Sequence, residues 1–255
     1  SPPKKGIQLH IKPFEIKPNF EREFFQYTDL NIDEDIYANR IEIEMRPGSH
    51  HFLLYSFDEN IKSSSLPEFD IKRDLRFEDG AYNVEVLRTM QYHEFFTGTQ
   101  WPRMDYKLPP GVAFKLNSKF GIDQNSHYVN RSDTTIIGEV FTNIHTIDES
   151  EVEKVANILN WSNQQILLPP KKVTTLNKTF ITDTPIYIGQ LFSHAHEKMT
   201  EFVVRIKGGE RNGELVYWTD DWEHPPIINY DPPIQLNNGE GLELITTYDN
   251  PDNRI

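Results

Sequence analysis

The sequence predicts an all-β protein built from antiparallel β-sandwich domains. Most of its apolar residues lie in short segments where polar and apolar side chains alternate, as in strands with one buried face. These segments are rich in β-branched and aromatic residues, and Pro, Gly, Asn and Asp separate them. Many short strands with such turns between them favour a β-sandwich or jelly roll over alternating strands and helices.

The clearest predicted strand spans residues 37–45, where Tyr37, Ile41, Ile43 and Met45 share one parity. Other predicted strands span residues 51–55, 82–87, 112–116, 134–141, 201–206, 214–218 and 241–248. Strong turn signals occur at residues 109–111 (Pro-Pro-Gly), 208–209 (Gly-Gly) and 237–239 (Asn-Asn-Gly). The strand and turn signals occur in both halves of the chain.

One segment has a helical pattern instead. Acidic residues from Asp148 onward precede apolar Val152, Val155, Ala156 and Leu159, which predicts a short amphipathic helix over residues 148–159. Two prolines at 169–170 then favour a stiff linker. We therefore expect an N-terminal domain over residues 1–148, a helix and linker over 149–171, and a C-terminal domain over 172–255. The last is short for a full sandwich.

The composition limits the classes of function. The net charge of −13, with no basic stripe, argues against nucleic acid as a partner. The absence of cysteine excludes disulfides, thiolate ligands and Cys nucleophiles. No apolar run approaches the roughly 18–20 residues that span a bilayer. The N-terminus lacks Met and has the character of a processed end, so we expect that any export signal has been removed.

Sequence motifs exclude further enzyme classes. The chain has no Gly-x-Ser-x-Gly elbow, phosphate loop or dinucleotide fingerprint. A His-Glu-x-x-His zinc motif is also absent. A glycosidase carboxylate pair stays open, since nothing selects two of the 39 Asp and Glu residues.

The histidines are the most informative residues. His194 and His196 are two residues apart, so on a strand both imidazoles project from one face and can reach one metal ion. His50 and His51 are adjacent and can converge only at a strand end or bulge, which Pro-Gly-Ser at 47–49 can supply. The alternative places one ring inward and the other in solvent. Imidazoles without thiolates suit Zn, Cu, Ni or Fe.

Other histidines give no such signal. His10, His145 and His224 have no partner at ligand spacing, and we expect them to be surface or hydrogen-bonded residues.

The histidine motifs resemble a known family. Residues 37–55, with Pro-Gly-Ser-His-His-Phe at 47–52, are similar to the first copper site of the copper type II ascorbate-dependent monooxygenases. These comprise the peptidylglycine α-hydroxylating and dopamine β-monooxygenases, and the bacterial relatives are especially similar. Residues 108–114 precede His-Tyr-Val-Asn at 127–130, which looks like the setting of the third histidine ligand. His-Ala-His at 194–196 resembles the second copper site, and residues 217–222 and 239–250 fit the family's C-terminal domain.

The resemblance covers nearly the whole chain and implies a function. It implies two jelly-roll-like antiparallel β-sandwich domains that face each other across a cleft, with one copper ion in each. His50, His51 and His127 would bind the electron-relay copper. His194 and His196 would bind the catalytic copper, where O₂ is activated and a C–H bond of a small organic substrate is hydroxylated. Ascorbate would be the reductant. A bacterial, extracytoplasmic (periplasmic or secreted) protein is implied, since the animal enzymes are rich in disulfides.

Two departures from the family pattern bear on the second site. The family's third catalytic ligand is a Met in an Asp-Glu-Met context beyond the position of Ile255, and none of the four methionines here lies in that motif. Met199 is expected to be a packing residue. Phe192 replaces the Arg that holds a peptide carboxylate, so we expect no peptide amidation.

Besides a glycosidase, the residues leave two other functions open. One is a non-catalytic copper-binding or interaction protein that keeps the fold. The other is a carbohydrate-binding module that uses Trp101, Trp218 and Trp222. The substrate and the oligomeric state are not predicted.

Overall fold

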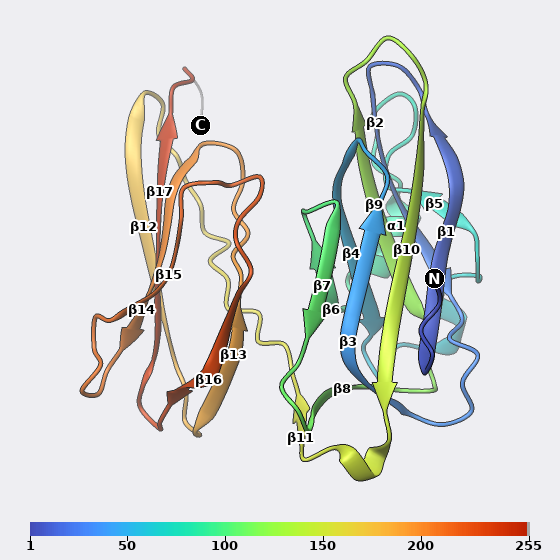
Figure 1. Ribbon diagram of the computed structural model, residues 1–255. Coiled ribbons are helices and arrows are strands. Elements are labelled where there is room, and N and C mark those ends of the chain that lie inside the picture. Colours follow the sequence, from blue (N-terminus) through green and yellow to red (C-terminus); the bar gives the residue numbers. More distant parts are fainter. Residues whose placement is uncertain (254–255) are drawn as a thin grey trace. The chain divides into compact units, whose positions relative to one another are not determined.

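The computed structural model describes residues 1–253 and confirms the all-β prediction, with 53% strand and 5% helix. The chain forms two compact units, residues 1–158 and 159–255 (Figure 1). The division lies within the segment predicted to link two domains. No helix among residues 1–253 is long and apolar enough to cross a membrane.

The first unit is a sandwich of two sheets. The six-stranded sheet contains β1 (Gly6–Ile16), β10 (Ile136–Ile147), β3 (Ile36–Met45), β8 (Val112–Leu116) and β11 (Lys154–Ala156) in that order, with β7 (Arg103–Lys107) also paired to β3. The five-stranded sheet contains β5 (Lys72–Asp74), β2 (Phe20–Thr28), β9 (Ile122–Asn130), β4 (Ser49–Phe57) and β6 (His93–Thr99). The first four strands of the chain alternate between the two sheets. The strand orders match a jelly roll, with β1-β10-β3-β7 in one sheet and β2-β9-β4-β6 in the other.

Alternation along the strands builds the core between the two sheets. Ile41, Ile43 and Met45 on β3 are each at most 5% exposed, which confirms the parity predicted for residues 41–45. The register with β10 shifts between His145 and Thr146, which leaves Asn39 of β3 unpaired in that ladder. This bulge reverses the parity, because a bulged strand carries one extra residue. Consequently Ala38 is buried and Tyr37 is not.

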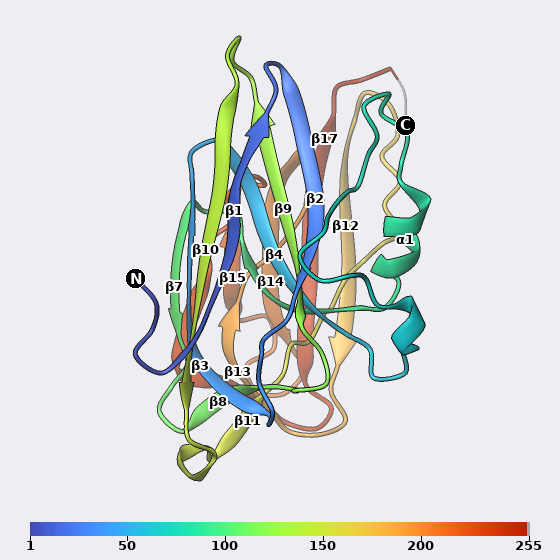
Figure 2. The same ribbon diagram turned by 90° about the vertical axis from the view of Figure 1, so that its right-hand side faces the viewer.

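Two of the predicted elements are wrong. Residues 82–87 are not a strand: helix α1 (Val84–Met90) begins where the Asn83 side chain accepts a hydrogen bond from Glu85 N, and it lies outside the strands (Figure 2). Val86 packs against Phe25 on the outer face of the five-stranded sheet. Residues with β propensity therefore form a helix, because an Asn cap and tertiary burial outweigh that preference.

The helix predicted over residues 148–159 is also wrong. Only a single 3₁₀ turn (Glu149–Glu151) forms, stabilised by a capping box between Asp148 and Glu151. The backbone N–H groups of Glu153 and Lys154 then donate to the Gly111 carbonyl, and the chain continues as β11, parallel to β8. These hydrogen bonds to Gly111 replace the ones that a helix would need, so the acidic residues from Asp148 onward cap a single 3₁₀ turn.

The second unit is a smaller sandwich. Its four-stranded sheet has the order β12 (Lys172–Ile181), β17 (Gly241–Asn250), β14 (Met199–Lys207) and β15 (Leu215–Thr219). A two-stranded sheet pairs β13 (Ile186–Leu191) with β16 (Ile228–Leu236). The strands predicted over 201–206 and 241–248 lie within these bounds, and the strand predicted over 214–218 is found one residue later, at Leu215–Thr219. The described residues provide six strands, fewer than the eight of a jelly roll.

Candidate metal centre

The five-stranded sheet brings three of the predicted ligands together. His50 and His51 lie at the start of β4, and His127 lies on the neighbouring strand β9. His51 is directly opposite His127, and the register shifts between Ser49 and His51, so His50 is the extra residue of a bulge. The bulge explains how adjacent histidines can serve one site, although neighbours on a regular strand point to opposite faces.

The three rings converge through their Nδ1 atoms. His51 Nδ1 lies 3.3 Å from His50 Nδ1 and 3.4 Å from His127 Nδ1. One ligand atom from each histidine falls within 4.8 Å of the other two. A metal ion with bonds of about 2.0–2.1 Å and tetrahedral angles holds its nitrogen ligands about 3.3 Å apart. The cluster therefore has the spacing of a metal site before any rearrangement.

The opposite edges of two rings are held by oxygen atoms. His127 Nε2 lies 2.8 Å from Glu21 Oε1, and His51 Nε2 lies 2.7 Å from Asn125 Oδ1. Carboxylate and carbonyl oxygens only accept hydrogen bonds, so each neutral ring carries its proton on Nε2. The Nδ1 atoms of His51 and His127, each an acceptor in this state, then lie 3.4 Å apart. Two such acceptors repel each other unless a cation or a donor lies between them, so the donor set fits a metal ion.

Burial favours the neutral state of His127, and contacts with neighbouring side chains favour the ionised state of Glu23. The pKa of His127 is lowered, chiefly by burial and then by the charge of His51, against the opposing influence of Glu23 and Glu21. Burial raises the pKa of Glu23, but its contacts with His51, His127 and Asn125 outweigh burial, and the net pKa is lowered. His127 is therefore neutral and Glu23 ionised near neutral pH, and metal binding requires neutral imidazoles.

The second pair of predicted ligands lies in the second unit, between β13 and β14. His194 and His196 are exposed, and their ring centroids are 5.0 Å apart. Ala195, between them, and Ser193, just before them, are buried. The segment is not part of a strand, which corrects the predicted setting, although both rings lie close together. Within residues 1–253, no third His, Cys, Asp or Glu completes a group with them. Met199 is 4% exposed and belongs to the core, as expected.

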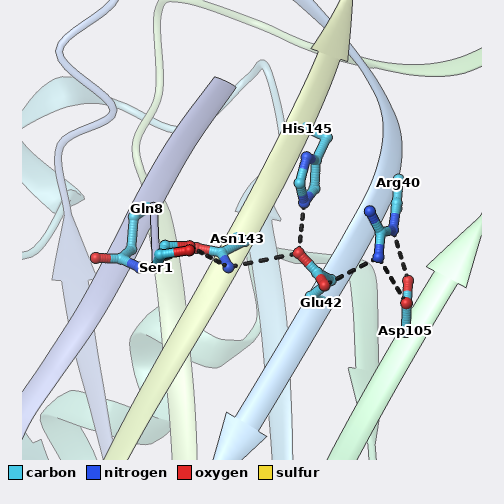
Figure 3. Close-up of polar contacts among 7 residues, drawn as sticks. All are labelled: Ser1, Gln8, Arg40, Glu42, Asp105, Asn143 and His145. Atoms are coloured by element: carbon cyan, nitrogen blue, oxygen red, sulfur yellow. Dashed lines mark hydrogen bonds and ion pairs between the residues drawn. The ribbon is translucent and has the colours of Figure 1, made fainter. Parts of the chain in front are cut away.

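Two of the histidines that were not predicted as ligands pair with carboxylates on the six-stranded sheet. His10 Nε2 lies 2.9 Å from Glu139 Oε1. His145 Nε2 lies 2.5 Å from Glu42 Oε2, and Glu42 also accepts from Arg40, which pairs with Asp105 (Figure 3). Both histidines are hydrogen-bonded, as expected.

Acid is expected to disrupt the Glu42 network. The hydrogen bond from His145, aided by the charge of Arg40 and opposed by burial, lowers the pKa of Glu42 from 4.5. Below pH 4.5 the unfolded state therefore binds more protons, so the stabilisation exists above that pH and is lost as the pH falls through the folded pKa. Urea unfolding should show Glu42→Gln less stable than the wild type at pH 7, and the difference should disappear once the pH falls below the folded pKa of Glu42. Glu34→Gln, at an exposed position of the same unit, should show no such convergence.

The tryptophans considered for carbohydrate binding are divided between the units. Trp101 belongs to the first unit, and Trp218 and Trp222 belong to the second. Trp222 packs against the second core, and Trp218 Nε1 donates to Glu201 Oε1 over 3.1 Å. No single unit presents all three.

Comparisons with known proteins do not identify a family. No family model matches the sequence, and no curated protein matches it significantly. Among solved structures, the crystal structure of PBSX exported protein XepA is similar over 97% of this chain and 89% of that chain, with 7% identity and a TM-score of 0.26. A TM-score this low carries no argument about fold or function. The residues of the histidine cluster therefore remain the basis for a functional proposal.

Proposed function

We propose that this chain is a copper protein of the ascorbate-dependent monooxygenase type. The convergence of the Nδ1 atoms of His50, His51 and His127 carries the proposal, because His51 and His127 are 76 residues apart in the sequence. Three neutral imidazoles suit Zn, Cu, Ni or Fe, and the choice of copper follows the resemblance of the motifs. Copper bound there would supply one-electron redox chemistry.

The two histidine groups suit different roles. His127 is 8% exposed, and protein oxygens hold the rings of His51 and His127 in place, which suits an electron-relay site that keeps its geometry. His194 and His196 are exposed and offer only two imidazoles, which leaves positions for a further ligand, O₂ and substrate. The proposed reaction is hydroxylation of a C–H bond in a small organic substrate, with ascorbate as reductant. The proposed location is extracytoplasmic.

Copper loading and oxygen consumption test this function. The loaded protein should bind two copper ions and consume O₂ when ascorbate and a substrate are supplied. His194→Ala should abolish turnover and leave one bound copper, because the cluster on β4 and β9 is unaffected. His145→Ala is the matched control, since His145 contacts Glu42 and lies outside the cluster. Copper binding without turnover in the wild type would favour the non-catalytic alternative.

A further inference from the structure

We propose that β2, which supplies no ligand, decides which nitrogen atoms the histidine cluster presents to a metal. Glu21 acts on His127, and Glu23 acts on His51 through Asn125. Both glutamates are positioning residues. Their effect on metal affinity rests on the proposed function, but their effect on the histidine tautomers belongs to the metal-free protein.

The contact at His127 is direct. A neutral imidazole carries one proton, on either Nδ1 or Nε2, and the nitrogen without it is the ligand. Glu21 Oε1 lies 2.8 Å from His127 Nε2 and can only accept, so it stabilises the tautomer with the proton on Nε2. His127 Nδ1 is then free of a proton and faces His51 Nδ1.

The contact at His51 passes through an amide. Asn125 Oδ1 lies 2.7 Å from His51 Nε2, but an amide turned by half a rotation would place its NH₂ group there and reverse the tautomer. Glu23 prevents this, because Asn125 Nδ2 donates to Glu23 Oε1 over 3.1 Å. Glu23 Oε1 also lies 3.6 Å from His51 Nε2, so the carboxylate favours a proton on that nitrogen. The Glu23 side chain is 19% exposed, so water competes little for its oxygen atoms.

Strand pairing places both carboxylates where they act. Glu21 and Glu23 are two residues apart on β2 and share a face, as do Asn125 and His127 on β9. Glu23 lies directly opposite His127, and Phe25 opposite Asn125. Each carboxylate therefore reaches diagonally to a partner on β9, which is within the range of a glutamate side chain.

Side-chain ¹⁵N NMR of the metal-free protein measures the tautomers directly. His51 and His127 should both carry the proton on Nε2. Glu23→Gln should give His51 a mixed tautomer and leave His127 unchanged, and Glu21→Gln should do the reverse. Glu139→Gln is the matched control, because Glu139 contacts only His10 among the histidines and should change neither ring. An unchanged His51 tautomer in Glu23→Gln would overturn the role of Glu23.

A rescue variant separates positioning from damage to the fold. Asn125→Asp places an acceptor-only group beside His51, so the double variant Glu23→Gln/Asn125→Asp should recover the Nε2–H tautomer. If the single variant Glu23→Gln misfolds, the double variant still gives the test, because its carboxylate at position 125 faces an amide at position 23 and stays ionised. A mixed His51 tautomer in the double variant would overturn the inference.

Copper(I) and zinc titrations then measure the consequence for affinity. Glu21→Gln and Glu23→Gln should each weaken binding at the cluster by about 10–100-fold, the usual effect of losing an outer partner of a ligand. Glu139→Gln should bind as the wild type does. If the wild type binds neither metal but the tautomers change as expected, the proposed function fails and the positioning roles stand.

Discussion

Asp123→Ala is expected to lower the free energy of unfolding of the first unit by about 3–5 kcal/mol. The Asp123 side chain is 0% exposed and lies between Arg73 Nη2 at 2.5 Å and His93 Nε2 at 2.8 Å. Its removal leaves the partly buried Arg73 guanidinium, on β5, without its countercharge. It also removes the side-chain link that joins β5 and the start of β6 to β9, because Arg73 and His93 share Asp123 as their partner. The lower free energy of unfolding therefore has two causes: an uncompensated charge on Arg73 and a weaker attachment of the segment between β4 and β6.

Urea unfolding, with hydrogen exchange of the β9 amides to isolate the first unit, measures this loss. Asp105→Ala is the matched control: its partner Arg40 is 2.7 Å away, but the Asp105 side chain is 56% exposed. Exposed pairs contribute about 0–1 kcal/mol, so this variant should remain close to the wild type. Equal effects of the two substitutions would show that Asp123 is not the buried anchor that we describe.

His127→Ala is expected to weaken metal binding at the cluster by more than about 100-fold, beyond the effect of losing an outer partner. The variant removes the one ligand that β9 contributes and leaves two adjacent imidazoles on β4. The fold should persist, because the ring lies on the outer face of the sheet and outside the core clusters. Competition with a chromophoric copper(I) chelator measures the affinity, and the metal-to-protein ratio measures the stoichiometry.

His10→Ala is the control for this prediction, since His10 is a histidine of the same unit that pairs with Glu139. It should leave both affinity and stoichiometry unchanged. Unaltered copper affinity in His127→Ala would place the metal elsewhere and remove the observation on which the proposed function depends.

Much of the β architecture was predictable because strand patterning is local. The alternation of Ile41, Ile43 and Met45, and the strand over residues 112–116, follow from side chains that project to opposite faces in turn. The helix Val84–Met90 was not predictable from that pattern, because its formation depends on burial of Val86 beneath Phe25 and Leu75. The helix expected after Asp148 does not form for a similar reason, since the backbone N–H groups of Glu153 and Lys154 donate to the Gly111 carbonyl instead.

The pairs His50–His51 and His194–His196 were candidates from their spacing, whereas His127 followed only from the resemblance of its motif. A strand end or bulge at His50 was an expected requirement for convergence. The surrounding residues were not predicted. Asn125 precedes His127 by two residues and so shares its face, which is a signal available in the sequence. Glu21 and Glu23 carry no such signal, because many carboxylates alternate along strands in this acidic chain.

The sequence by itself therefore determined the all-β class, the candidate ligands and the local patterns that place them on strands. Only the tertiary structure decided that β2 pairs with β9 with Glu23 opposite His127, and that Asp123 joins Arg73 to His93. The physical reason is the range of the interactions. Alternation and turn formation depend on neighbouring residues, whereas register and buried charge pairing depend on contacts that form when distant strands meet.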